Sequence, residues 1–203
     1  MMQALSSACD IVDAYEHPDE YLDEALLRLD VVIECELERI AASASAADGT
    51  SADAFRGMFM APEEAAAALM EERPLLRLSD DRRALLEQLD LRIAERLNKS
   101  RKSGRELPIL ALYDRLRLSE PEIRIVIAAL APHVNRKYLR LYGYLHDDMT
   151  RQTVTLDLLF RLCCRSEAER RAALAAMTNE GSVLKLLFAR HDAEDAVQEA
   201  SLL

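Results

Sequence analysis

Apolar residues recur at helical spacing along most of this chain of 203 residues. Between Pro18 and Ala42 they lie three or four positions apart, which places six of them on one face of a helix: Leu22, Leu26, Leu29, Ile33, Leu37 and Ile40. Ser79 can cap a second helix, because serine is favoured at helix starts. The apolar stripe of this helix consists of Leu86, Leu89, Ile93 and Leu97. The whole pattern of apolar positions predicts about seven to nine helices and almost no strands. We therefore expect an all-α fold, a multi-helix bundle.

The centre of the predicted core lies in residues 123–130, where nearly every residue is apolar. Such a run is typical of a helix buried on most sides, and we expect this helix to close at Pro132. Two pairs of residues have the spacing of a capping box, in which serine and glutamate side chains bond free amides at a helix start: Ser119 with Glu122, and Ser166 with Glu169.

A basic, glycine-containing break, NKSRKSGRE, begins at Asn98. It divides the chain into an acidic N-terminal helical region (residues 1–98), a basic linker (99–106) and a C-terminal helical subdomain (107–203). Four side chains in this break could bind phosphate: Lys99, Arg101, Lys102 and Arg105. Because no aromatic residues are interleaved with them and the protein is acidic, we favour a solvated linker.

Charge is distributed unevenly between the two regions. The formal net charge is −10, and residues 1–60 hold 13 acidic residues against three arginines, so all of the net charge belongs to them. An acidic surface repels nucleic-acid phosphates and favours basic protein partners. The alternative, which we favour, is a solvated helix face kept soluble by its carboxylates.

Nothing in the sequence predicts a membrane span or a secretory signal, so we expect a cytoplasmic protein with no membrane partner. The cysteines agree with this compartment. Cys9, Cys35 and the adjacent Cys163 and Cys164 lack the spacing of zinc ligands. We expect them to behave as small hydrophobic residues and predict no metal.

Three tyrosines, Tyr138, Tyr142 and Tyr144, cluster next to basic residues. Tyr138 and Tyr142 lie at helical spacing with apolar residues, which favours a stripe against the core with the hydroxyls reaching polar partners at its rim. The alternative is a protein-binding patch made of the three tyrosines and four basic residues: Arg136, Lys137, Arg140 and Arg151.

Asp147 and Asp148 follow His146 and suggest metal binding or acid–base chemistry. Side chains of adjacent helical residues point about 100° apart, so the two carboxylates do not converge on one ligand unless the chain bends there. We favour a turn in which one aspartate bonds loop amides near Thr150 or pairs with Arg151, before a cap at Thr150–Thr153 for the next helix. No catalytic residues are assigned.

Seven segments carry a resemblance to a known family: EALLRLD at 24–30, DAFRGMF at 53–59, LSEPE at 118–122, RKY at 136–138, LYGYL at 141–145, DDMTR at 147–151 and TLD at 155–157. In order and spacing they resemble the N-terminal variant winged-helix or helical domain of bacterial AAA+ ATPases, including those encoded with contractile injection systems. The resemblance implies a winged-helix-like C-terminal subdomain and a structural motif comprising Phe55, Arg56, Gly57, Asp147 and Asp148. Two stretches depart from the pattern: residues 133–135, where an acid-bearing segment is expected, and 152–154, where a proline is expected.

The chain lacks the P-loop that such ATPases carry, because none of its five glycines has the required spacing with a following lysine. We therefore expect no enzyme activity and no cofactor in this chain; the resemblance implies ATP and Mg²⁺ only for an ATPase domain absent from it. The chain is then either a segment joined in cis to an AAA+ core or a stand-alone relative.

These observations predict a non-catalytic protein-interaction or regulatory domain that recruits a substrate or assembly component. The acidic first helix and the segment from Arg136 to Arg151 are the predicted binding surfaces. The alternative is a nucleic-acid-binding winged-helix-like domain with Arg136, Lys137 and Arg140 near phosphates, which the net charge disfavours. A hydrolase using His146 and Asp147 is the weakest hypothesis.

Overall fold

The computed structural model describes residues 13–46, 78–150 and 154–178. These residues form seven helices and no strands: α2 (Pro18–Ala46), α4 (Asp80–Lys102), α5 (Pro108–Leu116), α6 (Glu120–Val134), α7 (Lys137–Leu145), α8 (Leu156–Cys163) and α9 (Glu167–Thr178). The all-α prediction is confirmed for this part of the chain. Six residues named above lie outside the described residues: Cys9, Phe55, Arg56, Gly57, Arg151 and Thr153.

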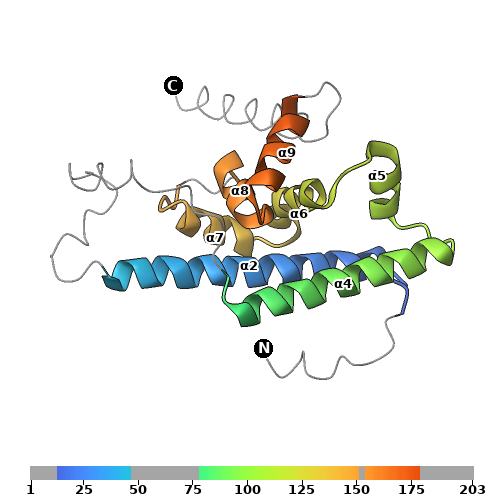
Figure 1. Cartoon of the computed structure of the whole chain (residues 1–203), viewed down its shortest axis with the longest axis horizontal. Coiled ribbons are helices and arrows are strands. Elements are labelled where there is room, and N and C mark those ends of the chain that lie inside the picture. The colour runs from blue at the N-terminus through green and yellow to red at the C-terminus, as the bar shows by residue number, and fades with distance from the viewer. Residues whose placement is uncertain (1–12, 47–77, 151–153, 179–203) are drawn as a thin grey trace.

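The two longest helices, α2 and α4, form an antiparallel pair along one side of the molecule (Figure 1). Helix α2 begins at Pro18, as predicted, and ends at Ala46, beyond the predicted Ala42. The predicted apolar stripe of α2 packs into the core: Leu26, Leu29 and Ile33 are buried, while the other three residues are partly buried against the same cluster.

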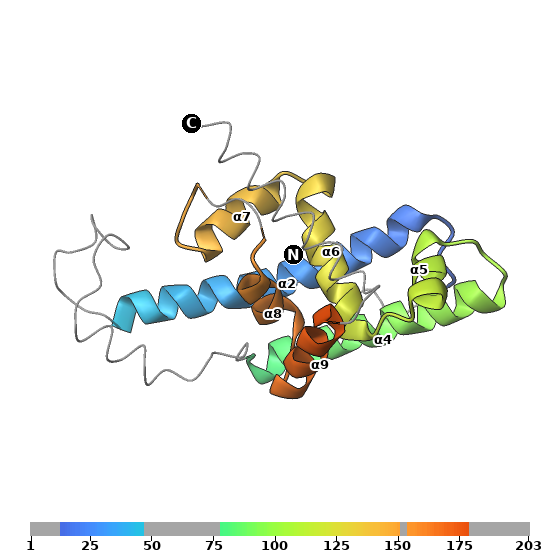
Figure 2. The ribbon, with the colours of Figure 1, turned by 90° about the horizontal axis from the view of Figure 1, so that it is seen from above.

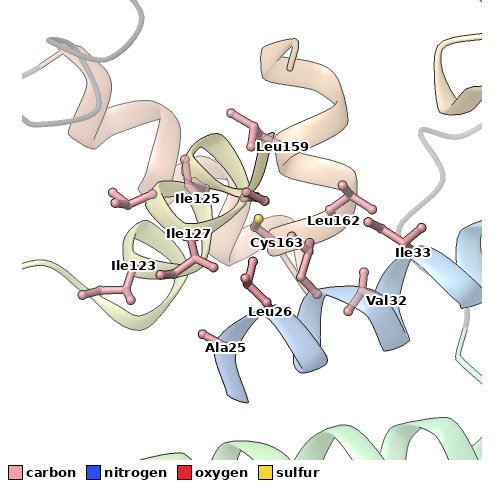
Figure 3. Close-up of a cluster of buried hydrophobic side chains, with 14 of the residues drawn as sticks. Ala25, Leu26, Val32, Ile33, Ile123, Ile125, Ile127, Leu159, Leu162 and Cys163 are labelled. Carbon is pink, nitrogen blue, oxygen red and sulfur yellow. The ribbon is translucent and has the colours of Figure 1, made fainter. Parts of the chain in front are cut away.

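Helices α6, α7 and α8 pack on α2 as a second layer, and α9 packs on α6 (Figure 2). Figure 3 shows the side chains of α2, α6 and α8 converging between these layers, with Leu26, Ile127 and Cys163 near the centre. Ile125, Ala128 and Ala131 of α6 have no exposed surface. The prediction that residues 123–130 form a centre of the core is therefore confirmed, except that Leu130 is exposed.

Helix α6 contains a proline that does not end it. The helix starts with the predicted capping box, in which the Ser119 N–H donates to the Glu122 carboxylate at 2.7 Å. It continues through Pro132 to Val134, so the predicted end at Pro132 is wrong. A proline lacks the N–H that would bond the carbonyl four residues earlier, which here is that of Ala128.

The basic break is shorter than predicted. Helix α4 runs to Lys102, so residues 98–102 are helical and the non-helical connection to α5 covers only residues 103–107. Gly104 has a φ of +66°, a left-handed conformation that glycine adopts without strain. Helices on both sides of this connection contribute to one hydrophobic cluster, so a division here separates sequence segments that share a core.

The caps of α8 and α9 differ in detail from the prediction. Helix α8 is capped by Thr155, whose hydroxyl accepts from the Leu158 N–H at 3.3 Å, and not by the predicted Thr150–Thr153 segment. At α9, the Ser166 hydroxyl accepts from the Glu169 N–H at 3.1 Å. The Glu169 carboxylate accepts from the N–H of Arg165, one residue before the cap, instead of from that of Ser166.

Candidate functional site

Helix α7 turns a basic and aromatic face to solvent. Arg136, Arg140 and Tyr144 lie four positions apart, at the start of α7 and along it, and therefore share one side. All three are exposed, Tyr144 to 50%. Within the described part of the chain their side chains make no hydrogen bond or ion pair. We call these three residues the α7 outer face.

The opposite side of α7 is buried, as the stripe interpretation predicted. Tyr138 and Tyr142 have no exposed surface, and their rings pack 6.2 Å apart between centroids. The Tyr138 hydroxyl donates to Asp30 on α2 at 2.9 Å, and the Tyr142 hydroxyl donates to the Ala128 carbonyl at 2.7 Å. Because both rings are enclosed, these two tyrosines cannot belong to a surface patch in the folded chain.

Lys137 is the member of the predicted basic patch that has an internal partner. Its ammonium lies 2.6 Å from the second carboxylate oxygen of Asp30 and 4.9 Å from the centroid of the Tyr138 ring. Asp30 therefore receives both Lys137 and Tyr138, and ties α7 to α2. The predicted patch is thus reduced to the α7 outer face, with the position of Arg151 outside the described residues.

The turn after α7 has the structural role that we favoured for the double acid. One Asp148 oxygen accepts from the Thr150 N–H at 2.9 Å and from its hydroxyl at 2.5 Å. Asp147 has a φ of +55°, so the chain reverses there, and Asp147 is exposed. A Cβ on Gly143 would lie 3.3 Å from the Met149 Cα, so this glycine lets the turn pack against the helix. Among the described residues, no group of three or more His, Cys, Asp or Glu side chains could hold a metal ion.

Half of the eight acids of α2 lie against arginines of α4, an arrangement that the spacing of residues in the sequence did not predict. The favoured interpretation of a solvated face applies to Asp19 and Asp23, which are exposed, but not to these four paired acids. Six ion pairs join the two helices: Arg82 with Glu34 (3.0 Å) and with Glu38 (2.8 Å), Arg92 with Glu24 (3.0 Å), Arg28 with Asp90 (2.6 Å), and Arg96 with Glu24 (2.8 Å) and with Glu20. These pairs follow the antiparallel register, so four carboxylates of α2 already have partners within the chain.

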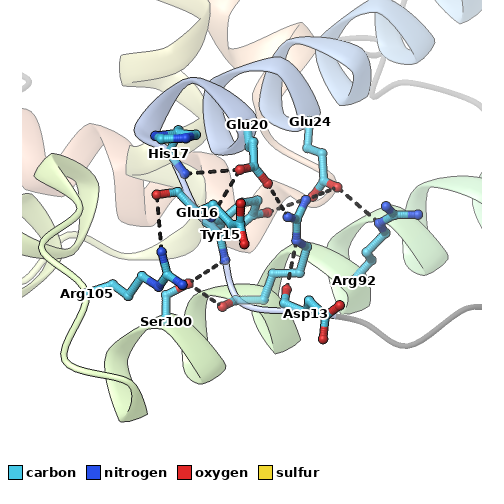
Figure 4. Close-up of polar contacts among 10 residues, drawn as sticks. Asp13, Tyr15, Glu16, His17, Glu20, Glu24, Arg92, Ser100 and Arg105 are labelled. Carbon is cyan, nitrogen blue, oxygen red and sulfur yellow. Dashed lines mark hydrogen bonds and ion pairs between the residues drawn. The ribbon is translucent and has the colours of Figure 1, made fainter.

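Figure 4 shows Tyr15, Glu20 and Glu24 gathered where the start of α2 meets α4. Arg96 of α4 joins this cluster. Its guanidinium stacks on the Tyr15 ring, with 4.0 Å from Cζ to the centroid, and pairs with Glu24 at 2.8 Å and with Glu20. The Tyr15 hydroxyl donates to Glu24 at 2.6 Å, and the Tyr15 N–H donates to the Ser100 hydroxyl at 2.9 Å. The four-residue spacing of Glu20 with Glu24, and of Arg96 with Ser100, was the signal available in the sequence.

A buried carboxylate joins α2 to the second layer. Glu36 is only 1% exposed, and one of its oxygens accepts from Arg39 at 3.0 Å and from Arg161 of α8 at 2.8 Å. A buried carboxylate is retained only when charged donors compensate for its lost hydration. This cluster therefore holds the two layers together.

A comparison with protein families decides what kind of domain this is. The family model described as "Winged helix domain, variant" matches residues 5–203. The chain belongs to this family. No curated protein and no solved structure matches it. The winged-helix part of the resemblance drawn from the sequence is thus confirmed.

This winged-helix variant keeps its described cysteines inside the fold. Cys35, Cys163 and Cys164 are buried free thiols, as expected of small hydrophobic residues. Burial raises the pKa of Cys163 to about 12 and that of Cys164 to about 11, so both stay protonated and unreactive near neutral pH. Within residues 13–46, 78–150 and 154–178, the variant has no helix whose length and hydropathy suit a membrane span.

Proposed function

We propose that this winged-helix variant is a non-catalytic protein-interaction domain that docks an acidic surface of its partner on the α7 outer face. The observation that carries the proposal is the contrast in how arginines are used. On α4, Arg82, Arg92 and Arg96 are held by carboxylates of α2, whereas Arg136 and Arg140 make no ion pair with described residues.

The composition of this face suits a protein partner. Arginine and tyrosine are enriched at protein interfaces, because guanidinium groups pair with carboxylates in two-point geometry while tyrosine buries a rigid ring with a polar tip. Val134 and Met149, which flank α7, are 50% and 59% exposed. Apolar surface around a cationic helix face supports docking of a partner more than simple hydration of the helix.

We further propose that the domain serves an AAA+ ATPase core carried in cis or supplied by a partner, and recruits a substrate or assembly component for it. The sequence segments that resemble N-terminal domains of such ATPases support this step. The chain itself should neither bind nor hydrolyse ATP, because it lacks the glycine cradle and lysine of a P-loop. Calorimetric titration with ATP and Mg²⁺ should show no saturable heat, and a micromolar site would refute this expectation.

The proposed surface is tested by placing a photo-crosslinking amino acid at position 144 in cells and identifying the protein that it captures. The same amino acid at Leu174, which is exposed on α9, is the control position. The captured protein is then purified and its affinity measured for the parent and for an Arg136→Ala/Arg140→Ala variant. We expect a loss of about tenfold or more for this variant, and little change for Arg115→Ala, an exposed arginine on α5.

Nucleic-acid binding is the second candidate, favoured by the winged-helix family match and by the same two free arginines. Opposing it are the net charge of −10 and the absence of a strand in the described residues that could serve as a wing. Anisotropy with labelled duplex DNA at physiological salt separates the candidates. Submicromolar, sequence-dependent binding that Arg136→Ala/Arg140→Ala removes would replace the protein-docking proposal.

A further inference from the structure

A pocket of about 540 Å³ opens where α2, α4, α6 and the end of α8 meet, on a different surface from the α7 outer face. Its walls are mainly apolar: Ala25, Leu29, Ile123, Ile127 and Leu162 line it together with the exposed Leu91 of α4. Leu91 is 64% exposed, which is unusual for a leucine at the edge of an apolar hollow. The volume lies in the range of sites that hold a small ligand or a few side chains of a peptide.

Three arginines from three parts of the chain also line this pocket: Arg28 of α2, Arg124 of α6, and Arg165 after α8. Asp90 of α4 lies between two of them, 2.6 Å from Arg28 and in contact with Arg165. Burial lowers the pKa of Arg28, and the charges of Arg124 and Arg165 lower it further against the opposing effect of Asp90. The guanidinium groups are therefore close enough to repel one another.

The carboxylates in direct contact with these arginines are fewer than the guanidinium groups. Asp90 serves Arg28 and Arg165, and Glu169 lies 3.5 Å from Arg124, so three guanidinium groups face two carboxylates. Arg124 has donor capacity to spare. Its Nη1 donates to the Cys163 carbonyl at 3.1 Å, whereas its Nε is buried without any hydrogen-bond partner. A buried donor without a partner is costly.

The open side of the pocket has the opposite charge. Glu87 and Glu120 line it and are exposed, so they stand toward solvent. An occupant that matches both zones has apolar groups for the walls, a carboxylate directed at the arginines, and a basic group at the rim. A phosphate would match the arginines but not the apolar walls or the acidic rim.

We propose that this pocket binds a short amphipathic peptide segment of a partner protein, in which leucine-type side chains fill the hollow, one carboxylate pairs with Arg124 and a basic residue meets Glu87 or Glu120. This site adds a second, apolar anchor to a domain whose α7 outer face is polar. Apolar anchors in concave pockets supply most of the binding free energy of helix-in-groove interactions, whereas the charges select the sequence.

The test uses the full chain, labelled with ¹⁵N, and the probe acetyl-Lys-Leu-Leu-Glu-Leu-Lys-amide. The matched probe has Gln in place of Glu and therefore keeps the shape but loses the charge. Titration to millimolar concentration should shift the Arg124 Nε–H resonance saturably, and the Gln peptide should bind roughly tenfold more weakly. In an Arg124→Gln variant the two peptides should bind equally.

Two variants of α4 test the location without touching the core. Ala94 is exposed and lines the pocket, so Ala94→Phe should fill the mouth and weaken binding of the Glu peptide about tenfold or more. Ala84 is equally exposed on α4 but does not line the pocket, so Ala84→Phe should leave the affinity unchanged within about twofold.

Three results would overturn the proposal. The first is no saturable shift of the Arg124 resonance with the Glu peptide. The second is equal binding to Ala94→Phe and Ala84→Phe. The third is an equal shift by inorganic phosphate or duplex DNA at the same concentration, which would assign the arginines to phosphate. Since Arg136→Ala/Arg140→Ala leaves this pocket intact, the result is independent of the α7 docking test.

Discussion

The α2–α4 pair and the α7 outer face use the same residue types in opposite ways. Between α2 and α4, arginines are paired with carboxylates, and Arg96 alone meets Glu20, Glu24 and the Tyr15 ring. On the α7 outer face, Arg136 and Arg140 have no such partners among the described residues. Charge in the first region holds the fold together, and charge in the second is available to another molecule.

This difference separates stability from binding. Removing a partner from an enclosed ion pair leaves a poorly hydrated charge behind, whereas removing an exposed arginine leaves only water. Changes between α2 and α4 should therefore lower stability, and changes on the α7 outer face should alter binding alone.

High pH should unfold the protein, because its buried tyrosines ionise only in the unfolded chain. Burial, the main cause, raises the pKa of Tyr15 and Tyr142 well above the ordinary value of 10.0, and the bond to Glu24 adds to the rise at Tyr15. A group of this kind, whose pKa is raised in the folded state, stabilises the fold fully at pH values below its pKa in the unfolded chain. This contribution is lost as the pH rises above that pKa.

The pKa values of the Cys163 and Cys164 thiols are also raised, from an ordinary value of 9.0. Stability should therefore fall progressively from about pH 9 upward. Tyrosinate absorbance and helical circular dichroism, measured together during an alkaline titration, check this. The loss of helix should coincide with the ionisation of the four buried tyrosines, Tyr15, Tyr21, Tyr138 and Tyr142. More than two tyrosinates per chain, out of six tyrosines, while the helices stay intact would contradict the enclosed packing.

Arg96→Ala should lower the free energy of unfolding by about 3 kcal/mol, because it leaves Glu24 enclosed beside a tyrosine ring without its main partner. Arg140→Ala is the matched change on α7 and should alter stability by no more than about 0.5 kcal/mol. Urea unfolding of both variants measures the difference. Equal effects would remove the distinction between the two regions.

The sequence predicted the apolar framework of the fold better than its ion pairs. Helical periodicity located the start of α2, the buried stripe and the core run of α6, because each depends on neighbours within one helix. The tyrosine stripe was correct for Tyr138 and Tyr142 on the same basis. The spacing of residues along one helix does not identify the helix that packs against it. The ion pairs between the acids of α2 and the arginines of α4 were therefore not predicted.

The failures have similar physical causes. The basic run after Asn98 looked like a linker, but the helix continues through it because Ser100 points inward and bonds the Tyr15 N–H, while Arg101 pairs with Asp114 at 2.9 Å. Pro132 looked like a helix end, but the Ala128 carbonyl that it leaves without a donor is satisfied from α7. In each case a residue distant in sequence supplies the missing interaction.

Tyr142→Phe should lower stability by about 1–2 kcal/mol, because it leaves the buried Ala128 carbonyl without a donor. Pro132 has no N–H to offer that carbonyl, and the variant removes the Tyr142 hydroxyl. Pro132→Ala restores a helical N–H for that carbonyl, so it should cost less stability in the Tyr142→Phe background than in the parent. A double-mutant cycle by urea unfolding measures this coupling. Tyr144→Phe, at an exposed position, should leave stability unchanged. If the effects of Tyr142→Phe and Pro132→Ala were additive, the Tyr142 hydroxyl would not be standing in for the missing N–H at position 132.

The smallest effect is expected in the turn that follows α7. Asp148→Ala removes both bonds to Thr150 and should lower stability by about 1 kcal/mol, a modest loss because the turn is exposed. Asp147→Asn should be almost neutral, since asparagine tolerates the φ of +55° and the Asp147 carboxylate is open to water. Thermal melts of the parent and both variants, with EDTA and with excess Mg²⁺, Mn²⁺ or Zn²⁺, provide the measurement. If a metal raised the melting temperature of the parent but not of Asp148→Ala, the carboxylate would be a ligand, and the turn would have to be counted with the α7 outer face as a binding region.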